Sequence, residues 1–180
     1  NLKGRKRKLV IISLGAGVQS STMALKAACG EFPRPDCAIF ADTGYEPKSV
    51  YNYLVSLKDI LPYPVHIVRK GNIKDDMLNS IDNGTRFPTA PFFTKNADTG
   101  KKGMLRRQCT NDYKIQPIRK KIRELCNVGY KKHFPKDKYV EQWIGISKDE
   151  IQRMKPARDP YILYRHPLIE ANMSRQDCVN

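Results

Sequence analysis

A run of small and hydroxyl-bearing residues near the start of the chain has the types and order that bind phosphate. Three small residues follow an apolar run at residues 9–12: Gly15, Ala16 and Gly17. Three hydroxyl residues follow where helical spacing resumes: Ser20, Ser21 and Thr22. Glycine lets a backbone approach a ligand closely, and the free N–H groups and dipole of a helix start favour an anion. We therefore predict a phosphate site here; a turn that needs small residues only for packing is the alternative.

A second group that could contact a ligand follows the next apolar run, at residues 37–41. Asp42, Thr43 and Gly44 come directly after this run. Ligands of open α/β sheets bind outside the carboxyl ends of the strands, so we expect this carboxylate and the loop at residues 15–17 to lie at one sheet edge. A structural helix cap is the alternative for Asp42.

These residues need parallel strands to bring them together. Apolar runs rich in β-branched residues alternate with helical patterns, at residues 9–12, 37–41 and 65–68. The β-α-β-α-β order predicts a Rossmann-like α/β fold with an open, mostly parallel, twisted sheet and helices on both faces. A further strand is predicted at residues 139–146, and further helices at residues 73–81, 115–125 and 147–154. We expect residues 1–8 to be a basic flexible arm and residues 9–180 to be a single domain.

Smaller features complete the predicted organisation. Residues 84–103 lack periodicity, and we expect a lid near the site there. Ser147 and Glu150 predict a capping box, and Ser174 and Asp177 a second one; since the chain ends soon after Asp177, we expect the natural protein to continue beyond residue 180. His66 lies inside a predicted strand, where a structural role is expected.

The charge of the chain points to polyanionic partners. Lys and Arg number 33 against 18 Asp and Glu, a formal net charge of +15, which favours nucleotides or nucleic acid such as tRNA or DNA. The cations gather in four clusters, at residues 3–8, 101–107, 114–123 and 131–138. A solvated basic face is the equal alternative for the helix at residues 115–125, because no aromatic residues interleave its cations.

The cysteines and the hydropathy limit the classes of protein to which this chain can belong. The five cysteines are odd in number and widely spaced, which argues against a disulfide framework and leaves reduced thiols or metal ligands. No apolar run approaches the roughly 18 residues of a membrane span. We therefore expect a soluble, cytoplasmic protein without membrane contact; its oligomeric state stays open.

Four short motifs occur in a set order along the chain. The first two are the loop Gly15-Ala16-Gly17-Val18-Gln19-Ser20 and the triplet Asp42-Thr43-Gly44. The third places Lys114 and Pro117 after Cys109 in the pattern Cys-x4-Lys-x2-Pro, and the fourth is Gly-x4-Glu-x2-Arg, with Gly145, Glu150 and Arg153. Together they resemble the PP-loop ATP pyrophosphatase (adenine nucleotide alpha-hydrolase) superfamily, and within it the phosphoadenosine phosphosulfate (PAPS) reductase-like branch. The family's loop is Ser-Gly-Gly-x-Asp-Ser, so Gln19 stands where the family has Asp.

The resemblance implies an adenine nucleotide, ATP or a PAPS-like relative, over the carboxyl edge of the sheet, with Mg²⁺ expected. The binding residues it implies are Ser13, Gly15, Ala16, Gly17, Gln19, Ser20, Ser21, Asp42, Thr43, Gly44 and Gly145. Asp42 would contact ribose, base or Mg²⁺, and Lys114 and Arg153 would neutralise charge as a phosphoanhydride breaks. Cys109 and Cys178 would be two of the four ligands of an iron–sulfur cluster if a further C-terminal segment supplied the others.

Three functions follow from these expectations. The first is cleavage of the α,β-phosphoanhydride of ATP to adenylate an unknown acceptor, in sulfur or nucleic-acid modification. The second is thiol-dependent reduction of a sulfonucleotide, which needs a cysteine in a C-terminal tail. The third is binding of nucleotide or nucleic acid without hydrolysis, for which Gln19 is the motivating residue.

Overall fold

The computed structural model describes residues 4–84, 93–96, 99–104, 110–129 and 132–180. Within these residues five parallel strands form one open sheet in the order β3-β2-β1-β6-β7. The strands are β1 (Lys6–Leu14), β2 (Cys37–Asp42), β3 (Val65–Arg69), β6 (Lys138–Trp143) and β7 (Ile162–Arg165). A separate antiparallel hairpin consists of β4 (Phe93–Lys95) and β5 (Lys102–Met104). The predicted α/β class with an open parallel sheet is confirmed.

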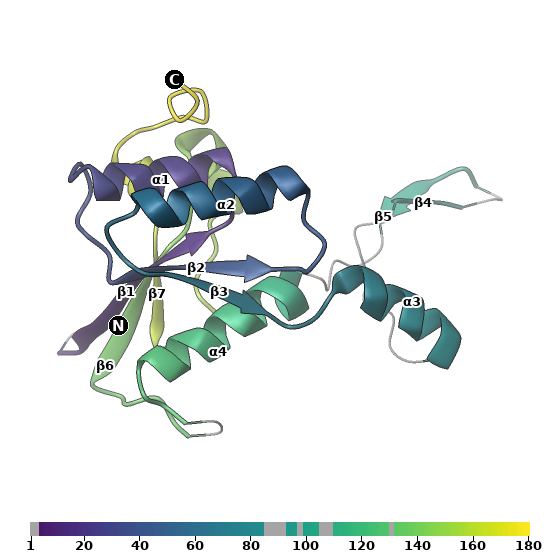
Figure 1. Ribbon diagram of the computed structural model, residues 1–180, viewed down its shortest axis with the longest axis horizontal. Coiled ribbons are helices and arrows are strands. Elements are labelled where there is room, and N and C mark those ends of the chain that lie inside the picture. The colour runs from purple at the N-terminus through teal and green to yellow at the C-terminus, as the bar shows by residue number, and fades with distance from the viewer. Residues whose placement is uncertain (1–3, 85–92, 97–98, 105–109, 130–131) are drawn as a thin grey trace.

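Helices cover both faces of this sheet (Figure 1). The described residues form the helices α1 (Val18–Ala28), α2 (Lys48–Ile60), α3 (Ile73–Asn83), α4 (Gln116–Leu125) and α5 (Pro167–Glu170), with a π-helical segment at Thr110–Ile115 and a 3₁₀ helix at Lys148–Arg153. Figure 1 shows α1 and α2 on one face and α4 on the other, while α3 and the β4–β5 hairpin extend beyond the carboxyl ends of β2 and β3. None of the helices in the described parts of the chain is both long and apolar enough to cross a membrane.

The alternation of side chains along each strand divides the core into two layers. In β1, Ile12 packs with α1 and α2, whereas Ile11 packs with α4. In β2, Phe40 and Ile39 divide between the two layers in the same way. Because both faces are covered, β1 and β2 carry continuous apolar runs, which is the pattern that made them predictable.

The strand order has a switch point between β1 and β6. From β1 the chain moves outward through α1 to β2 and then through α2 to β3. It then returns to the other side of β1, where β6 pairs with it. The strand order therefore reverses between β1 and β6, and open α/β sheets bind their ligands at the carboxyl edge beside such a point.

Several predicted boundaries differ from the structure. β1 begins at Lys6 rather than residue 9, so residues 6–8 belong to a strand and not to an arm: the Lys6 N–H donates to the Asp137 carbonyl at 2.7 Å, and Lys6 pairs with Lys138. These side chains are exposed, so hydropathy gives no sign of the strand. β6 ends at Trp143, and residues 144–147 form a loop. All but the last residue of the β4–β5 hairpin falls in residues 84–103, for which no regular structure was predicted. Residues 85–92 and 97–98 of the predicted lid lie outside the described part.

The two predicted capping boxes have different outcomes. The Ser174 hydroxyl and N–H both donate to Asp177 Oδ2 at 2.7 Å, and the Asp177 N–H donates back to Ser174 Oγ at 3.2 Å, so the hydrogen bonds of this box are confirmed. The helix that it was expected to open is absent from the described residues, where residues 175–179 form turns. The box at Ser147 is wrong, because no side-chain hydrogen bond caps the 3₁₀ helix that follows it. The carboxylate of Glu150 is instead occupied by Gln19 and Arg153.

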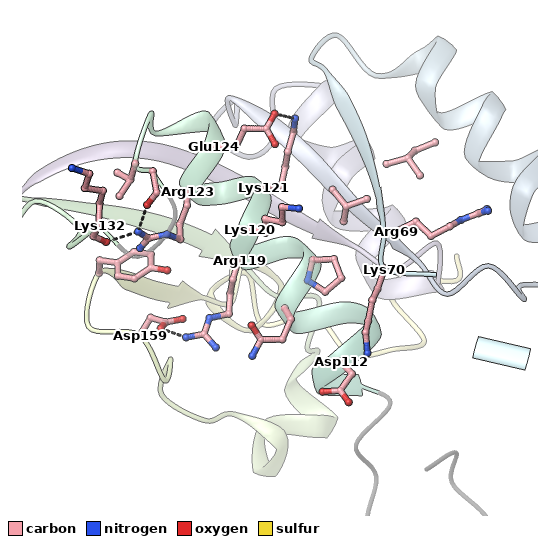
Figure 2. A pocket seen from close by; sticks show the side chains of 17 residues that line it. Arg69, Lys70, Asp112, Arg119, Lys120, Lys121, Arg123, Glu124, Lys132 and Asp159 are labelled. Atoms are coloured by element: carbon pink, nitrogen blue, oxygen red, sulfur yellow. Dashed lines mark hydrogen bonds and ion pairs between the residues drawn. The ribbon is translucent and has the colours of Figure 1, made fainter. Parts of the chain in front are cut away.

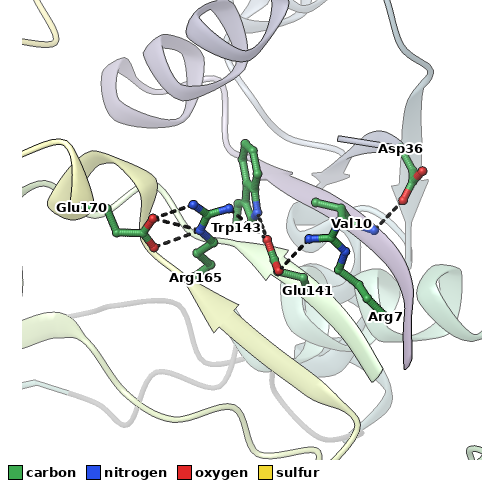
Figure 3. A network of polar contacts seen from close by, with 7 residues as sticks. All are labelled: Arg7, Val10, Asp36, Glu141, Trp143, Arg165 and Glu170. Atoms are coloured by element: carbon green, nitrogen blue, oxygen red, sulfur yellow. Dashed lines mark hydrogen bonds and ion pairs between the residues drawn. The ribbon is translucent and has the colours of Figure 1, made fainter. Parts of the chain in front are cut away.

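Strand β7 and helix α5 were not predicted, and a polar network explains how β7 is held (Figure 3). The buried Glu141 on β6 accepts from the indole N–H of Trp143 at 2.7 Å, from Arg165 on β7 at 3.3 Å and from Arg7 on β1 at 3.4 Å. Arg165 also donates to Glu170. A buried carboxylate is tolerated when it is paired and hydrogen-bonded, so Glu141 ties three strands together.

Candidate functional site at the carboxyl edge of the sheet

The loop between β1 and α1 is closed by the Ser20 hydroxyl. Ser20 Oγ accepts from the Gly15 N–H at 3.1 Å and donates to the Gly17 carbonyl at 3.0 Å. Ala16 has φ 52, in the left-handed region, and Gly17 is the N-cap of α1 without a side-chain cap. Gly15 and Gly17 are exposed. The groups that remain for an anion are the backbone N–H groups of the first turn of α1, which have no intrahelical acceptor.

The other two serines predicted for this site face inward. Ser13 Oγ accepts from the Gln142 side-chain amide at 2.7 Å, which links β1 to β6. Ser21 Oγ is buried and makes no hydrogen bond with the described residues. The structure therefore gives Ser13 and Ser21 places in the packing beneath the loop rather than on its surface.

Gly145 lies directly against the first turn of α1. A Cβ at this position would meet the Ser20 N at 2.9 Å, the Ser20 Cα at 3.0 Å and the carbonyl carbon of Gln19 at 3.2 Å. Real Cβ atoms essentially never approach backbone below 3.0 Å. The loop after β6 can therefore reach α1 only because residue 145 is glycine, and this contact places the fourth predicted motif beside the first.

Gln19 joins the start of α1 to two distant segments. Its side-chain amide N–H donates to Glu150 Oε2 at 3.0 Å, and its carbonyl oxygen accepts from Arg175 at 3.1 Å. Glu150 also accepts from Arg153 at 2.7 Å. An amide can donate to a carboxylate and accept from a guanidinium, whereas an aspartate would bring a second negative charge to Glu150. This neighbour gives a physical reason for Gln at position 19.

Arg175 is a residue at this site that the sequence did not indicate. Its backbone N–H donates to Asp149 Oδ1 at 2.9 Å, in addition to the side-chain contact with Gln19. The Cys178 carbonyl accepts from the Thr22 hydroxyl at 2.9 Å, so the C-terminal turn is docked on α1. Gln19 and Arg175 are 156 positions apart, and no local pattern relates them.

Asp42 lies at the predicted sheet edge, but its oxygens are taken by groups of this chain. Oδ1 accepts from the Gly44 N–H at 2.7 Å and from the Tyr51 hydroxyl at 2.9 Å, and Oδ2 accepts from the Arg69 guanidinium. Burial alone would raise the pKa of Asp42, yet these hydrogen bonds outweigh it and lower the pKa. Asp42 is therefore an ionised anchor between β2, β3 and the loop that follows.

The remainder of the Asp42 loop is equally ordered. Gly44 has φ 76, and a Cβ there would meet the Gly71 carbonyl oxygen and the Asn72 Cα, each at 2.8 Å. The Thr43 hydroxyl donates to Glu46 Oε1 at 3.0 Å, and Lys114 Nζ lies 3.9 Å from the same oxygen. Lys114 belongs to the π-helical segment Thr110–Ile115, a rare conformation that is frequent at functional sites. The structure thus brings Lys114 to the predicted Asp-Thr-Gly triplet.

The predicted residues therefore gather in two adjacent groups at one edge. The first group joins the β1–α1 loop to Gly145, Glu150, Arg153 and Arg175. The second joins Asp42 to Thr43, Gly44, Glu46 and Lys114. Because β1 and β2 are neighbouring parallel strands, both groups lie at the carboxyl edge of the sheet.

The predicted metal ligands are tested only in part. Cys109 lies outside the described residues. Cys178 is half-buried, and burial is the main cause that raises the pKa of its thiol, which favours the protonated form over the thiolate that binds metal. Among the described residues no three His, Cys, Asp or Glu side chains are grouped to hold a metal ion. The iron–sulfur cluster stays a prediction.

Comparison with known proteins finds no matching family model and no significantly similar curated protein. The established likeness of this chain is thus to parallel, Rossmann-like α/β folds in general.

Proposed function

We propose that this chain binds ATP or a related adenine nucleotide at the carboxyl edge of the sheet, with its phosphates over the first turn of α1. The observation that supports this best is the exposed loop at residues 15–17, which opens onto the free N–H groups of α1 at the switch point between β1 and β6. We further propose that the chain is a PP-loop protein of the PAPS reductase-like branch, on the basis of its four motifs.

The proposed reaction is transfer of an adenylyl group to an acceptor. A nucleophile of the acceptor attacks the α-phosphorus, the bond from that phosphorus to the bridging oxygen breaks, and pyrophosphate leaves with the electron pair. Arg153 and Arg175 lie at the start of α1, where fixed cations would stabilise the charge that develops on pyrophosphate. Lys114 would act similarly from the Asp42 side of the edge.

Nucleotide and metal fit the described residues differently. The glycines and free amides of the loop suit a phosphate. Mg²⁺ would have to share Asp42 with Arg69, Tyr51 and the Gly44 N–H, and position 19 offers an amide rather than a carboxylate. The described residues therefore do not fit Mg²⁺ as they fit a phosphate.

Release of pyrophosphate from labelled ATP tests the reaction, and equilibrium binding of ATP tests the site. Gly17→Val places a branched side chain at the exposed N-cap of α1, and we expect it to weaken ATP binding at least tenfold. Ser56→Val on exposed α2 is the matched control and should bind like the wild type. Equal affinities of all three proteins would refute this phosphate site.

Binding without hydrolysis is the second candidate, and the contacts of Gln19 favour it. Because both ends of the amide are occupied by Glu150 and Arg175, Gln19 holds the loop and leaves no carboxylate there. This candidate predicts ATP binding without pyrophosphate release at any acceptor tested. Pyrophosphate release that Arg153→Ala abolishes would reject it.

Reduction of a sulfonucleotide remains a third, separate proposal. It requires an accessible thiolate, whereas the thiol of Cys178, whose backbone carbonyl contacts Thr22 on α1, has a raised pKa. Thiol-dependent release of sulfite from PAPS, lost when a C-terminal cysteine is replaced, would support it over adenylation.

A further inference from the structure

An open groove of about 1390 Å³ runs beside α4, on the face of the sheet opposite α1 and α2. Figure 2 shows that its cationic side chains come from three segments: the end of β3, the outer surface of α4 and the loop after α4. Seven cations line it: Arg69, Lys70, Arg119, Lys120, Lys121, Arg123 and Lys132. Against three lining carboxylates, Asp112, Glu124 and Asp159, these cations leave a net charge of +4.

Three of the cations are neutralised by carboxylates of this chain. Arg69 pairs with Asp42, Arg119 with Asp159 and Lys121 with Glu124. Pairs of this kind fix the side chains in place and cancel their charge. They therefore attract a further anion less than unpaired cations do.

The other four make no ion pair with a described residue. Arg123 donates to the carbonyls of Gly129 and Lys132, which orient its guanidinium without neutralising it. Lys70 lies over the Tyr113 ring with Nζ 4.7 Å from its centroid. No ion pair within the described residues engages Lys120 or the side chain of Lys132 (Figure 2).

The groove has the length and direction of a path for a charged polymer. α4 has 10 residues, or about 15 Å at 1.5 Å per residue. Phosphates of one nucleic-acid strand recur about every 3.4 Å along a helix, so about four would face α4. One end of the groove includes Arg69, which contacts Asp42, so the path begins at the candidate nucleotide edge.

The tertiary structure also supplies an aromatic surface that the sequence of α4 lacks. Tyr161 lines the groove and stacks on Phe134, with ring centroids 4.2 Å apart and planes 8° from parallel. Tyr161 arrives from the loop before β7, some 40 positions from α4, so spacing along α4 gives no sign of it.

The residue composition of the groove indicates which class of partner it fits. The cores of protein–protein interfaces are depleted in charged residues, and membrane-surface helices expose a broad apolar face. Here cations dominate a concave surface, which is typical of interfaces with nucleic acid. We infer that this groove binds the phosphodiester backbone of a nucleic acid, through Lys70, Lys120, Arg123 and Lys132.

The test is binding of fluorescent tRNA, single-stranded DNA and duplex DNA without nucleotide, at 50 and 200 mM salt. Four phosphate contacts predict a log–log salt slope of about −3 to −4 and about a 100-fold loss of affinity over this range. The double variant Lys120→Gln/Lys132→Gln should reduce the magnitude of the slope by about 1.5 to 2. Stronger binding of tRNA than of either DNA would identify RNA as the source of the backbone, and the reverse would identify DNA.

The matched control is Lys48→Gln/Lys58→Gln, which removes the same charge from exposed positions of α2 on the opposite face. It should leave the slope unchanged. Equal effects of the two double variants would overturn the inference, since bulk charge alone would then explain binding. Equal affinity for polyglutamate and nucleic acid would overturn it too. Because no nucleotide is present, failure here leaves the proposed nucleotide site intact, and failure of ATP binding leaves this test intact.

Discussion

Replacing Gly145 with alanine should separate the loop after β6 from the first turn of α1. The added Cβ would lie 2.9 Å from the Ser20 N and 3.0 Å from its Cα, whereas ordinary contacts begin near 3.4 Å. Both atoms that it meets are backbone, so the two segments must move apart by about 0.5 Å or strain elsewhere. Forced overpacking of this kind costs about 1–3 kcal/mol of the free energy of unfolding.

Urea denaturation followed by fluorescence measures this cost directly. Trp143 is the single tryptophan and is fully buried two residues before Gly145, so its emission reports on this region. For a domain of this size each kcal/mol lowers the melting temperature by about 2–4 °C. The same displacement should lengthen the hydrogen bond from Gln19 to Glu150, which is 3.0 Å in the native structure, and weaken nucleotide binding.

Gly129→Ala is the control for adding one methyl group. Its Cβ would meet only the Lys132 Cγ, at 3.4 Å, on a flexible side chain. We expect its stability to stay within about 0.5 kcal/mol of the wild type. If Gly145→Ala unfolds at the same urea concentration as Gly129→Ala, the close approach between residue 145 and α1 is refuted.

Three further predictions concern charge and thiol chemistry. Hydrogen bonds from Arg69 and its neighbours lower the pKa of Asp42 below its ordinary value of 3.8. Ionised Asp42 therefore stabilises the fold above pH 3.8, and this contribution is lost as the pH falls through the lowered pKa. Asp42→Asn should flatten the pH dependence of the urea midpoint between about pH 5 and pH 2, and an unchanged pH profile would contradict this. Glu141→Gln should lower the free energy of unfolding by about 1–3 kcal/mol, because two arginines lose their common carboxylate; an equilibrium denaturation curve that matches the wild type would disprove it. In a Cys109→Ser background, the exposed Cys29 should react with a thiol reagent at pH 8 well before the buried Cys37, whose pKa is raised to about 12 mainly by burial; mass spectrometry of the labelled peptides decides the order.

The elements with strong periodicity could be predicted from the sequence, and those defined by pairing could not. In α2 the residues Leu54 and Leu57 are buried at helical spacing, and β2 is buried along its whole length. β7 has only 4 residues at the sheet edge, with one of them buried. Short edge strands are specified by their partner, so β7 depended on the ladder with β6 and on the contact between Arg165 and Glu141.

The candidate site shows the same division. A glycine loop between a strand and a helix is a local pattern, so the β1–α1 loop could be located from sequence, and its exposed glycines agree with that prediction. The roles of its side chains could not. The Ser20 hydroxyl bonds to the backbone of the loop itself. Asp42 accepts hydrogen bonds from Arg69 and Tyr51, and its partner Arg69 depends on which strands become neighbours.

The sequence by itself determined the strand–loop–helix unit at the start of the chain, the parallel α/β class and the excess of positive charge, because each depends on neighbouring residues or on composition. Only the tertiary structure decided that Gln19 meets Glu150 and Arg175, 131 and 156 positions away. It likewise decided that Tyr161 joins the cations of α4 in one groove. Contacts at such separations follow from the order of strands around the switch point, and a one-dimensional pattern does not contain that order.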